Sequence, residues 1–461
     1  MVLTLDYTCF VRGGPQGEVG VDPEHLEQAA DQHAEKLSSL KGKRDSGQLG
    51  FFDLPDDRST MAACLEYAES VSGRFENIVV MGIGGSALGT QALHAALSRP
   101  LHDSRLPNDR PRLFVVDNVD PSLVGGVLRV ANPETTLFNV ISKSGSTAET
   151  MSQFLLFLEA LKAAVGDSWR DHIVVTTDAQ QGFLRPFADV HALKSFVVPD
   201  NVGGRFSVLS PVGLLPGALM GWNLPQLLEG AAHGRNRSLS GDFAQNPAAV
   251  WAACHHLLDT RCGVHSQVLF PYSHRLRLMV DWNVQLVAES LGKVDAQGRR
   301  IGPFPHGAVG ATDQHSQVQL FAQGPRDKAF TFLRVLNHKD DLLIPDHPQG
   351  LDELAYLSGK TFGQLLDAEC RATQLALTDA GCPNALISVP EVDAHSVGEF
   401  LMWSMVATAY GGELYGVDAF DQPGVEAGKV ATYGLMGRPG FEQERSRVEG
   451  RKISDPNYRV I

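Results

Sequence analysis

Two glycine-rich turns of this chain contain the residue types that bind phosphate. The first turn, Gly82–Ser86, directly follows an apolar run at 77–80. The second turn, Ser142–Thr147, follows an apolar run at 137–140 and offers four hydroxyls and one ammonium. Each pattern predicts a strand, a turn and the start of a helix, where flexible glycines, outward-pointing amides and the helix dipole favour an anion. Two such turns in one domain indicate a small phosphorylated ligand.

The first turn has a competing interpretation as part of a dinucleotide-binding fold. Gly82, Gly84 and Ala87 fit the loose pattern G-x-G-x-x-G/A, and Asp117 ends the next predicted strand. Ser86 and the whole second turn argue against it, because a dinucleotide fold has no evident need for them. These residues alone leave the two ligands about equally favoured. A Walker loop is excluded, since Lys143 precedes its glycine instead of following a GxxxxG frame.

Residues elsewhere have the chemistry for proton transfer, although each is ambiguous alone. Gln285 and Glu289 lie one turn apart on the predicted helix 275–291. A carboxylate at the border of an apolar face can gain the proton affinity that a general base needs. Most helical glutamates are simply solvated, so spacing alone does not favour catalysis. Three further candidates, each as often a surface or capping residue, are Arg205, His315 and Lys429.

Composition narrows the class of protein. The chain has 461 residues, of which 43% are hydrophobic, enough for two or three globular domains. A net charge of −14 argues against general nucleic-acid binding, so local amides and cations must attract any anionic substrate. The group His255, His256 and His265 has no cysteine or carboxylate at ligand spacing, and we reject a zinc site there.

The sequence also indicates a cellular location. The region near Met1 has no basic stretch with an apolar core, and prolines and glycines interrupt the most apolar later segment, 208–222. Six cysteines are scattered, without a metal or disulfide spacing. We therefore expect a soluble cytoplasmic protein that binds neither membrane nor nucleic acid.

These candidate residues must be positioned by an α/β fold, because short apolar runs alternate with longer amphipathic stretches. The predicted strands of a first doubly wound sheet are 77–80, 112–116, 136–141, 172–176 and 195–198. A helical segment at 211–228 precedes a second, smaller sheet with strands at 266–270, 329–336 and 385–389. Further helices are predicted at 23–40 and 361–380. The charged tail from Gly437 onward lacks periodicity, which predicts an extended arm or partial disorder.

Six segments, taken in chain order, resemble those of the compact bacterial type of the glucose-6-phosphate isomerase family, which is also called the phosphoglucose isomerase family. They are Gly82–Ser86, Ser142–Thr147, Gly203–Ser207, Glu289–Lys293, Asp313–Ser316 and Gln422–Lys429. The resemblance implies two doubly wound parallel-sheet sugar-isomerase (SIS) domains. It also implies an aldose-ketose isomerase that interconverts glucose 6-phosphate and fructose 6-phosphate. The expected parts are a helical segment at 1–45, a larger first domain at 46–210 with the phosphate turns, a second domain at 211–436 with the catalytic base, and an arm at 437–461.

The resemblance further implies a role for each matching residue. Glu289 matches the general base that moves a proton between C1 and C2 through a cis-enediol, and Arg205 matches the cation that stabilises the enediolate. His315 and Lys429 match the pair that opens the sugar ring. The other matches bind substrate: Ser142, Ser144, Thr147 and the backbone around Lys143 hold the phosphate, Gly85 and Ser86 lie beside it, and Gln285 and Gln422 contact sugar hydroxyls. Isomerisation leaves the oxidation state unchanged overall, so no redox cofactor is expected. No metal is expected either, because Arg205 would cover the charge.

Because the family is dimeric, the resemblance implies a homodimer in which His315 completes the partner's pocket. Two alternatives stay open at this point: a dual isomerase that also accepts mannose 6-phosphate, and a sugar-phosphate sensor without catalysis. A sensor would have no need for four residues together, namely Glu289, Arg205, His315 and Lys429. The chain departs from the family at Asp281, where many relatives have more aromatic residues nearby, and it lacks the long insertions of larger members.

Overall fold

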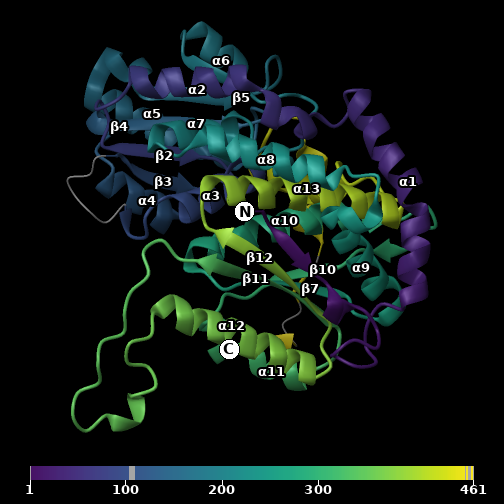
Figure 1. Cartoon of the computed structure of the whole chain (residues 1–461). Coiled ribbons are helices and arrows are strands. Elements are labelled where there is room, and N and C mark those ends of the chain that lie inside the picture. The colour runs from purple at the N-terminus through teal and green to yellow at the C-terminus, as the bar shows by residue number, and fades with distance from the viewer. Residues whose placement is uncertain (1, 103–109, 452, 455–457, 460–461) are drawn as a thin grey trace. The chain divides into compact units, whose positions relative to one another are not determined.

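The computed structural model describes residues 2–102, 110–451, 453–454 and 458–459. The chain divides into two compact units, Met1–Ala419 and Phe420–Ile461. Both large β-sheets lie in the first unit, and Figure 1 shows helices α8, α10 and α13 between them. The expected α/β class with parallel sheets is confirmed.

The first sheet is parallel throughout and has the strand order β3-β2-β4-β5-β6. Its strands are β2 (Asn77–Met81), β3 (Arg112–Val116), β4 (Thr136–Ser142), β5 (Ile173–Thr177) and β6 (Lys194–Val197). All five predicted strands are therefore present. Every residue of β2, β4 and β5 is buried, as expected for central strands covered by helices on both faces.

The second sheet has the order β1-β12-β11-β7-β10, with only β1 antiparallel to its neighbour. Its strands are β1 (Thr4–Asp6), β7 (Ser266–Pro271), β10 (Phe304–Gly307), β11 (Lys328–Asn337) and β12 (Asn384–Glu391). A two-stranded ribbon pairs β8 (Lys293–Val294) with β9 (Arg300–Ile301). The prediction that the second sheet is smaller was wrong: each sheet has five strands in the described part of the chain. The two missed strands are short edge strands, and β10 contains Pro305, which weakens a strand signal.

Helices surround the two sheets. Those of the first unit are α1 (Pro23–Asp45), α2 (Arg58–Ser70), α3 (Leu88–Leu97), α4 (Pro121–Val130), α5 (Ala148–Val165), α6 (Leu184–Val190), α7 (Pro211–Met220), α8 (Leu224–Ser238), α9 (Pro247–Cys262), α10 (Arg277–Leu291), α11 (Val318–Gln323), α12 (Phe362–Asp379) and α13 (Ala394–Tyr415). The helix predicted at 211–228 is two helices, because Gly221 adopts the left-handed conformation that ends α7. Among the described residues, no helix combines the length and apolar character needed to cross a membrane.

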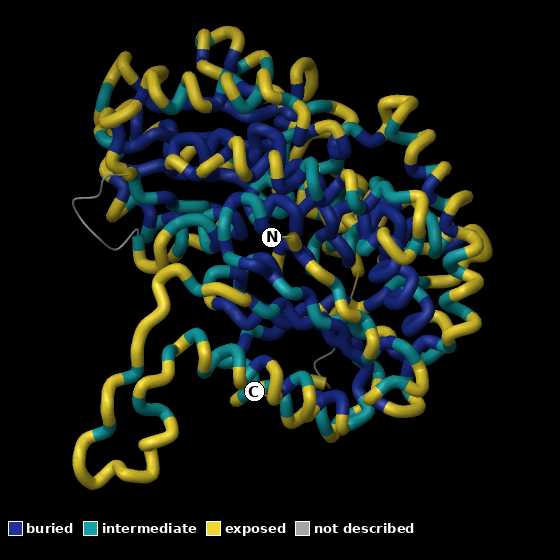
Figure 2. The backbone as a smooth tube through the Cα atoms, viewed as in Figure 1, coloured by how far each residue is buried: buried dark blue, intermediate teal, exposed yellow. Residues whose placement is uncertain are grey.

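Helix α13 forms a central part of the core, and its residues 396–412 are buried (Figure 2). It packs closely against α8, because glycines let the two backbones approach. A Cβ atom added to Gly398 would lie 2.0 Å from the carbonyl oxygen of Leu227, and one added to Gly230 would lie 1.9 Å from that of His395. Two backbones thus meet where no side chain fits.

Replacing Gly398 with alanine is expected to lower the free energy of unfolding by about 1–3 kcal/mol, the usual cost of overpacking a core. Gly42 in α1 provides the matched control, because no described atom outside its own stretch of helix lies within 4 Å of an added Cβ there. Gly42→Ala should raise the same quantity by about 0.4–1 kcal/mol through its helix propensity. Urea unfolding followed by circular dichroism measures both. Equal effects of the two alanines would contradict the close helix contact.

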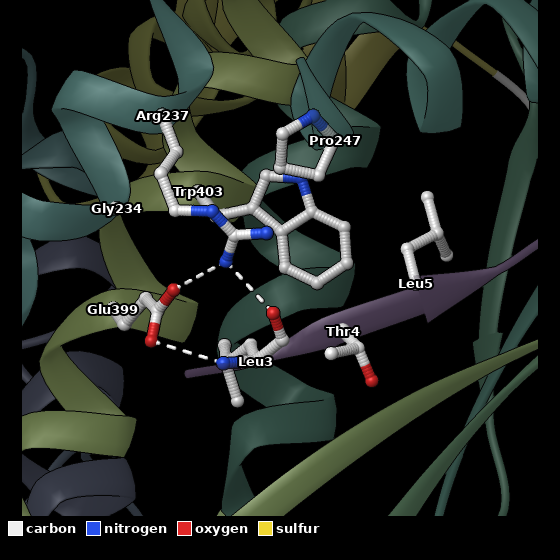
Figure 3. Close-up of a pocket in the computed structure, with 8 residues that line it drawn as sticks. All are labelled: Leu3, Thr4, Leu5, Gly234, Arg237, Pro247, Glu399 and Trp403. Atoms are coloured by element: carbon white, nitrogen blue, oxygen red, sulfur yellow. Dashed lines mark hydrogen bonds and ion pairs between the residues drawn. The ribbon is translucent and has the colours of Figure 1, made fainter. Parts of the chain in front are cut away.

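The N-terminal strand is fastened to the α8–α13 pair by a buried carboxylate (Figure 3). Glu399 accepts hydrogen bonds from the Leu3 backbone N–H at 3.2 Å and from Arg237 Nη1 at 2.6 Å. The same Arg237 nitrogen donates to the Leu3 carbonyl oxygen at 2.7 Å. The charge on Glu399, whose side chain is 2% exposed, is thus paired and hydrogen-bonded, as a buried charge must be.

The second unit contains helices α14 (Glu426–Leu435) and α15 (Glu442–Gly450). The rings of Tyr433 and Phe441 meet at 5.3 Å, and Arg438 covers the Tyr433 ring at 4.4 Å. The prediction of an extended or partly disordered arm was wrong for 442–450, which is helical although none of its residues is buried. Ion pairs one helical turn apart support this helix without an apolar stripe. Residues 452, 455–457 and 460–461 of the predicted arm lie outside the described residues.

Candidate active site

The first glycine turn joins β2 to α3 through a short 3-10 segment at Gly84–Ser86. Gly84 has a φ of +56°, which favours glycine. A Cβ atom added to Gly85 would lie 2.3 Å from the carbonyl carbon of Gly204 and 2.7 Å from the backbone nitrogen of Arg205. The glycine at position 85 therefore allows this turn to touch the loop that carries Arg205.

The second turn joins β4 to α5 and gathers its hydroxyls at the start of that helix. Thr147 Oγ1 lies 3.1 Å from Ser142 Oγ and 3.2 Å from Ser144 Oγ. Gly145 has a φ of +60°, and its carbonyl oxygen accepts from the Phe183 N–H at 2.9 Å, which fixes the turn. Hydroxyl donors at the N-terminal end of an 18-residue helix suit a phosphate dianion.

The two turns lie at the same edge of the first sheet. Strands β2 and β4 are parallel neighbours, with Met81 opposite Val140 at their carboxyl ends. Ligands of open α/β sheets bind outside this edge. The topology thus brings together the two turns, which are about 60 residues apart in sequence.

Arg205 and Glu289 form an ion pair beside the first turn. Arg205 Nη1 lies 3.2 Å from Glu289 Oε2, and the guanidinium also donates to Ser290 Oγ at 2.7 Å and to the Ala419 carbonyl oxygen at 2.6 Å. The Arg205 side chain is only 2% exposed, whereas that of Glu289 is 33% exposed. A fixed cation thus lies behind a carboxylate that solvent, and therefore a ligand, can reach.

Gln285 links this ion pair to the first turn. Its Nε2 donates to Glu289 Oε1 at 3.1 Å, and a Cβ on Gly84 would lie 2.9 Å from the same nitrogen. Its buried Oε1 has no hydrogen-bond partner among the described residues. An orphan acceptor at this position suits a substrate hydroxyl.

The remaining predicted site residues are not part of the contacts that join Arg205, Gln285 and Glu289. His315 is exposed at the end of the 3-10 segment Thr312–His315, which follows β10. Gln422 and Lys429 belong to the second unit, where Lys429 Nζ lies 2.8 Å from Glu426 Oε1. Their assigned roles stay predictions.

The structure also identifies site contacts to which the sequence assigned no role. Ser290 orients the Arg205 guanidinium, although only its position next to Glu289 drew attention to it. The contact of Gly85 with Gly204 joins segments about 120 residues apart, and no local pattern predicts it. In the described part of the chain, no group of three or more histidine, cysteine, aspartate or glutamate side chains is placed to hold a metal ion.

A family model described as "Phosphoglucose isomerase" matches residues 62–446. The chain belongs to the phosphoglucose isomerase family. The matched span contains both glycine-rich turns and the whole Arg205–Glu289 cluster, and it also contains His315, Gln422 and Lys429.

Relatives within the phosphoglucose isomerase family are similar over nearly the whole chain. A glucose-6-phosphate isomerase from Rubrobacter xylanophilus is 48% identical and covers 95% of this chain and 99% of its own length. A glucose-6-phosphate isomerase from Carboxydothermus hydrogenoformans is 45% identical, and the match covers 89% of this chain and 90% of that protein. A hypothetical protein from Thermus thermophilus with a crystal structure is 41% identical in sequence. The match covers 95% of this chain and 100% of that protein, and the TM-score is 0.86. A glucose-6-phosphate isomerase from Chlamydia trachomatis, 24% identical with a TM-score of 0.80 and coverage of 97% and 91%, shares the fold.

Proposed function

We propose that this chain interconverts glucose 6-phosphate and fructose 6-phosphate as an aldose-ketose isomerase. One observation carries the proposal: the Glu289 carboxylate is held between Arg205 and Gln285 beside a glycine turn at the ligand-binding edge of the first sheet. A carboxylate supplies a base for a proton next to a carbonyl, and the fixed guanidinium supplies positive charge for the resulting enediolate. Membership of the phosphoglucose isomerase family supports the choice of substrate.

In the proposed reaction the sugar phosphate binds at the two turns, where the hydroxyls of Ser142, Ser144 and Thr147 donate to it. Gly85 and Ser86 lie beside it in the first turn. Glu289 then removes the proton from C2 of the open-chain aldose while the C1 carbonyl oxygen gains one, which gives a cis-enediol. The return of the proton to C1 and the loss of the C2 hydroxyl proton give the ketose, so atoms and charge balance. Arg205 stabilises the enediolate oxygen.

Other parts of the proposal rest on the family resemblance. His315 and Lys429 open the sugar ring, and Gln285 and Gln422 contact sugar hydroxyls. The protein acts in the cytoplasm as a homodimer of two-domain protomers, with the boundaries expected from the sequence, and it binds neither nucleic acid nor membrane.

The direct test is turnover of fructose 6-phosphate by purified, dialysed and chelator-treated protein. A coupled dehydrogenase measures the glucose 6-phosphate formed, and mannose 6-phosphate is assayed in parallel. Turnover of fructose 6-phosphate without added metal or cofactor would support the proposal. Binding of the sugar phosphates without turnover by folded protein would overturn it and favour a sensor.

A shared active site predicts a specific pattern of complementation. His315→Leu and Glu289→Gln should each abolish most activity. In a mixed dimer, one site would then have both Glu289 and His315 intact, provided that the histidine comes from the neighbouring protomer. Random reassortment of equal amounts should therefore restore about one quarter of the wild-type activity. The mixture should be assayed after co-expression with two affinity tags. No recovery in purified mixed dimers would show that His315 acts within its own protomer.

A further inference from the structure

Lys143 lies in the second turn, but its ammonium is occupied by another loop. Its Nζ donates to the carbonyl oxygens of Asp200 at 2.8 Å and Val202 at 2.7 Å. An ammonium has three donors, so at most one remains for a phosphate. Burial of the side chain lowers the pKa of Lys143, and the nearby carboxylates of Asp178 and Asp200 oppose that shift. Burial removes part of the hydration of the Lys143 ammonium, and the hydrogen bonds to the two backbone carbonyls replace the bonds to water.

The two carbonyls belong to the segment that leads into Arg205, here called the arginine loop (199–206). The loop begins with a turn in which the Val202 N–H donates to the Pro199 carbonyl oxygen at 3.1 Å. Val202 is fully buried and lies three residues before Arg205. At Gly204 and Arg205 the loop touches the first turn, through Gly85. Lys143 therefore connects the second turn to the loop that positions the catalytic cation.

A second support reaches the arginine loop from the 3-10 segment Gly50–Asp56. The Gly50 N–H donates to the Asn201 carbonyl oxygen at 3.2 Å, and Asn201 Nδ2 donates to the Gly47 carbonyl oxygen at 2.8 Å. A Cβ on Gly50 would lie 2.2 Å from Asn201 Oδ1, so the two chain segments are in close contact. The rings of Phe51 and Phe206 meet at 4.8 Å.

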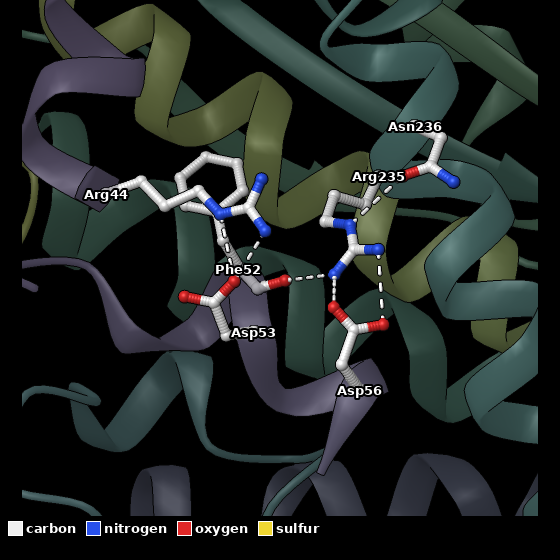
Figure 4. A network of polar contacts seen from close by, with 6 residues as sticks. All are labelled: Arg44, Phe52, Asp53, Asp56, Arg235 and Asn236. Atoms are coloured by element: carbon white, nitrogen blue, oxygen red, sulfur yellow. Dashed lines mark hydrogen bonds and ion pairs between the residues drawn. The ribbon is translucent and has the colours of Figure 1, made fainter.

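The supporting segment is itself anchored on two sides (Figure 4). Arg235 of α8 donates to Asp56 Oδ2 at 2.5 Å and to the Phe52 carbonyl oxygen at 3.0 Å. Arg44 of α1 donates to Asp53 Oδ1 at 2.9 Å through Nε. Helices α1 and α8 thus hold the segment that contacts Asn201, while Lys143 binds the carbonyl oxygens of the residues before and after it, Asp200 and Val202.

We propose that Lys143 is a positioning residue that fixes the arginine loop, and that its ammonium is not a ligand of the substrate phosphate. Asn201 performs the same task through its contacts with Gly47 and Gly50. Through these contacts the second turn, which binds the phosphate, is joined to the cation that stabilises the reacting centre. The inference rests on the proposed isomerase function. It replaces a direct electrostatic role of the lysine with a geometric one.

The test compares kcat with phosphate affinity in Lys143→Met, which removes the ammonium but retains a long apolar side chain. Inorganic phosphate, used as a competitive inhibitor, reports on the phosphate site. We expect kcat to fall about tenfold or more, because a small displacement of a catalytic group is costly, while KM and the inhibition constant for phosphate change less than about threefold. Lys143→Arg should recover part of the loss, since a guanidinium can donate to both carbonyls.

Asn201→Ala provides a second route to the same prediction without touching the phosphate turn. It should lower kcat with phosphate inhibition unchanged, and its effect should be less than multiplicative with that of Lys143→Met, because both act on one loop. Lys162→Met in α5, also the loss of a positive charge but exposed, is the matched control and should change neither quantity. Thermal melts verify that each variant is folded.

The inference is overturned if Lys143→Met weakens phosphate inhibition tenfold while kcat is kept, since the ammonium would then be a phosphate ligand. It is also overturned if Asn201→Ala leaves kcat unchanged. Both comparisons are made against the kcat of the wild-type enzyme, so they can be interpreted only if the wild-type enzyme is active. Absence of wild-type turnover would instead contradict the isomerase function itself, so the two failures are distinguishable.

Discussion

Replacing Glu289 with glutamine is expected to lower kcat about 10²–10⁴-fold, with KM for fructose 6-phosphate nearly unchanged. The carboxylate is the only proposed acceptor for the proton that moves between C1 and C2, and an amide cannot take a proton at neutral pH. In the proposed reaction the substrate binds mainly at the two turns, which this substitution leaves intact. Initial rates across a range of substrate concentrations separate the two constants.

The substitution should also have a small cost in stability. Glu289 accepts from Arg205 through Oε2 and from Gln285 through Oε1. In the glutamine variant the NH₂ group cannot accept as the carboxylate oxygen did, and the charge that pairs with Arg205 is lost, at about 1 kcal/mol. Glu289→Asp keeps the charge but withdraws it by one methylene, and an intermediate loss of kcat is expected. If Glu289→Gln lowers the melting temperature only slightly and the variant stays folded at the assay temperature, the loss of kcat comes from catalysis and not from unfolding.

Asp281→Asn is the matched control for Glu289→Gln. It removes a carboxylate from the same helix, α10, but from an exposed position outside the Arg205–Glu289 cluster. Its kcat should stay within about twofold of wild type, the range expected for a surface change. If both amides inactivate the enzyme equally, the loss comes from the helix and not from the proposed base.

The central strands were predictable because their residues are buried on both faces. Runs such as Asn77–Met81 and Ile173–Thr177 are short, apolar and bounded by turns, which is the local signal of a parallel strand. Strand β1 has only three residues, two of them exposed, and gains its place through pairing with β12. Such a strand is stabilised by a distant partner, so no local signal identifies it.

The candidate site was predictable in its parts but not in its connections. Hydroxyls and glycines after a buried strand indicate an anion site whatever the rest of the chain does. The pairing of Arg205 with Glu289 joins residues 84 positions apart, and spacing alone favoured a solvated glutamate. Lys143 shows the same limit, because its residue type suited a phosphate whereas its partners are two backbone carbonyls of a loop almost 60 residues later. Long-range packing decides such contacts.

Arg205→Lys is expected to be the other severe substitution, although it keeps the positive charge. The guanidinium uses a planar fork to reach Glu289, Ser290 and the Ala419 carbonyl oxygen at once. An ammonium is a single point charge on a flexible stem and cannot occupy all three positions. We expect kcat to fall about 10²–10³-fold, the usual effect of removing a preorganised charge stabiliser, and proton transfer to remain the slow step. A primary isotope effect with glucose 6-phosphate deuterated at C2 measures the latter.

A separate loss of stability should accompany Arg205→Lys, because at least one buried acceptor loses its donor, at about 1–3 kcal/mol. Arg237→Lys is the matched control: Arg237 also bonds a carboxylate and a backbone carbonyl, those of Glu399 and Leu3, but it lies outside the candidate site. It should lower the melting temperature while leaving kcat of the folded enzyme nearly unchanged. If Arg205→Lys behaves in the same way, the arginine supports the fold alone, and the enediolate must be stabilised by another group.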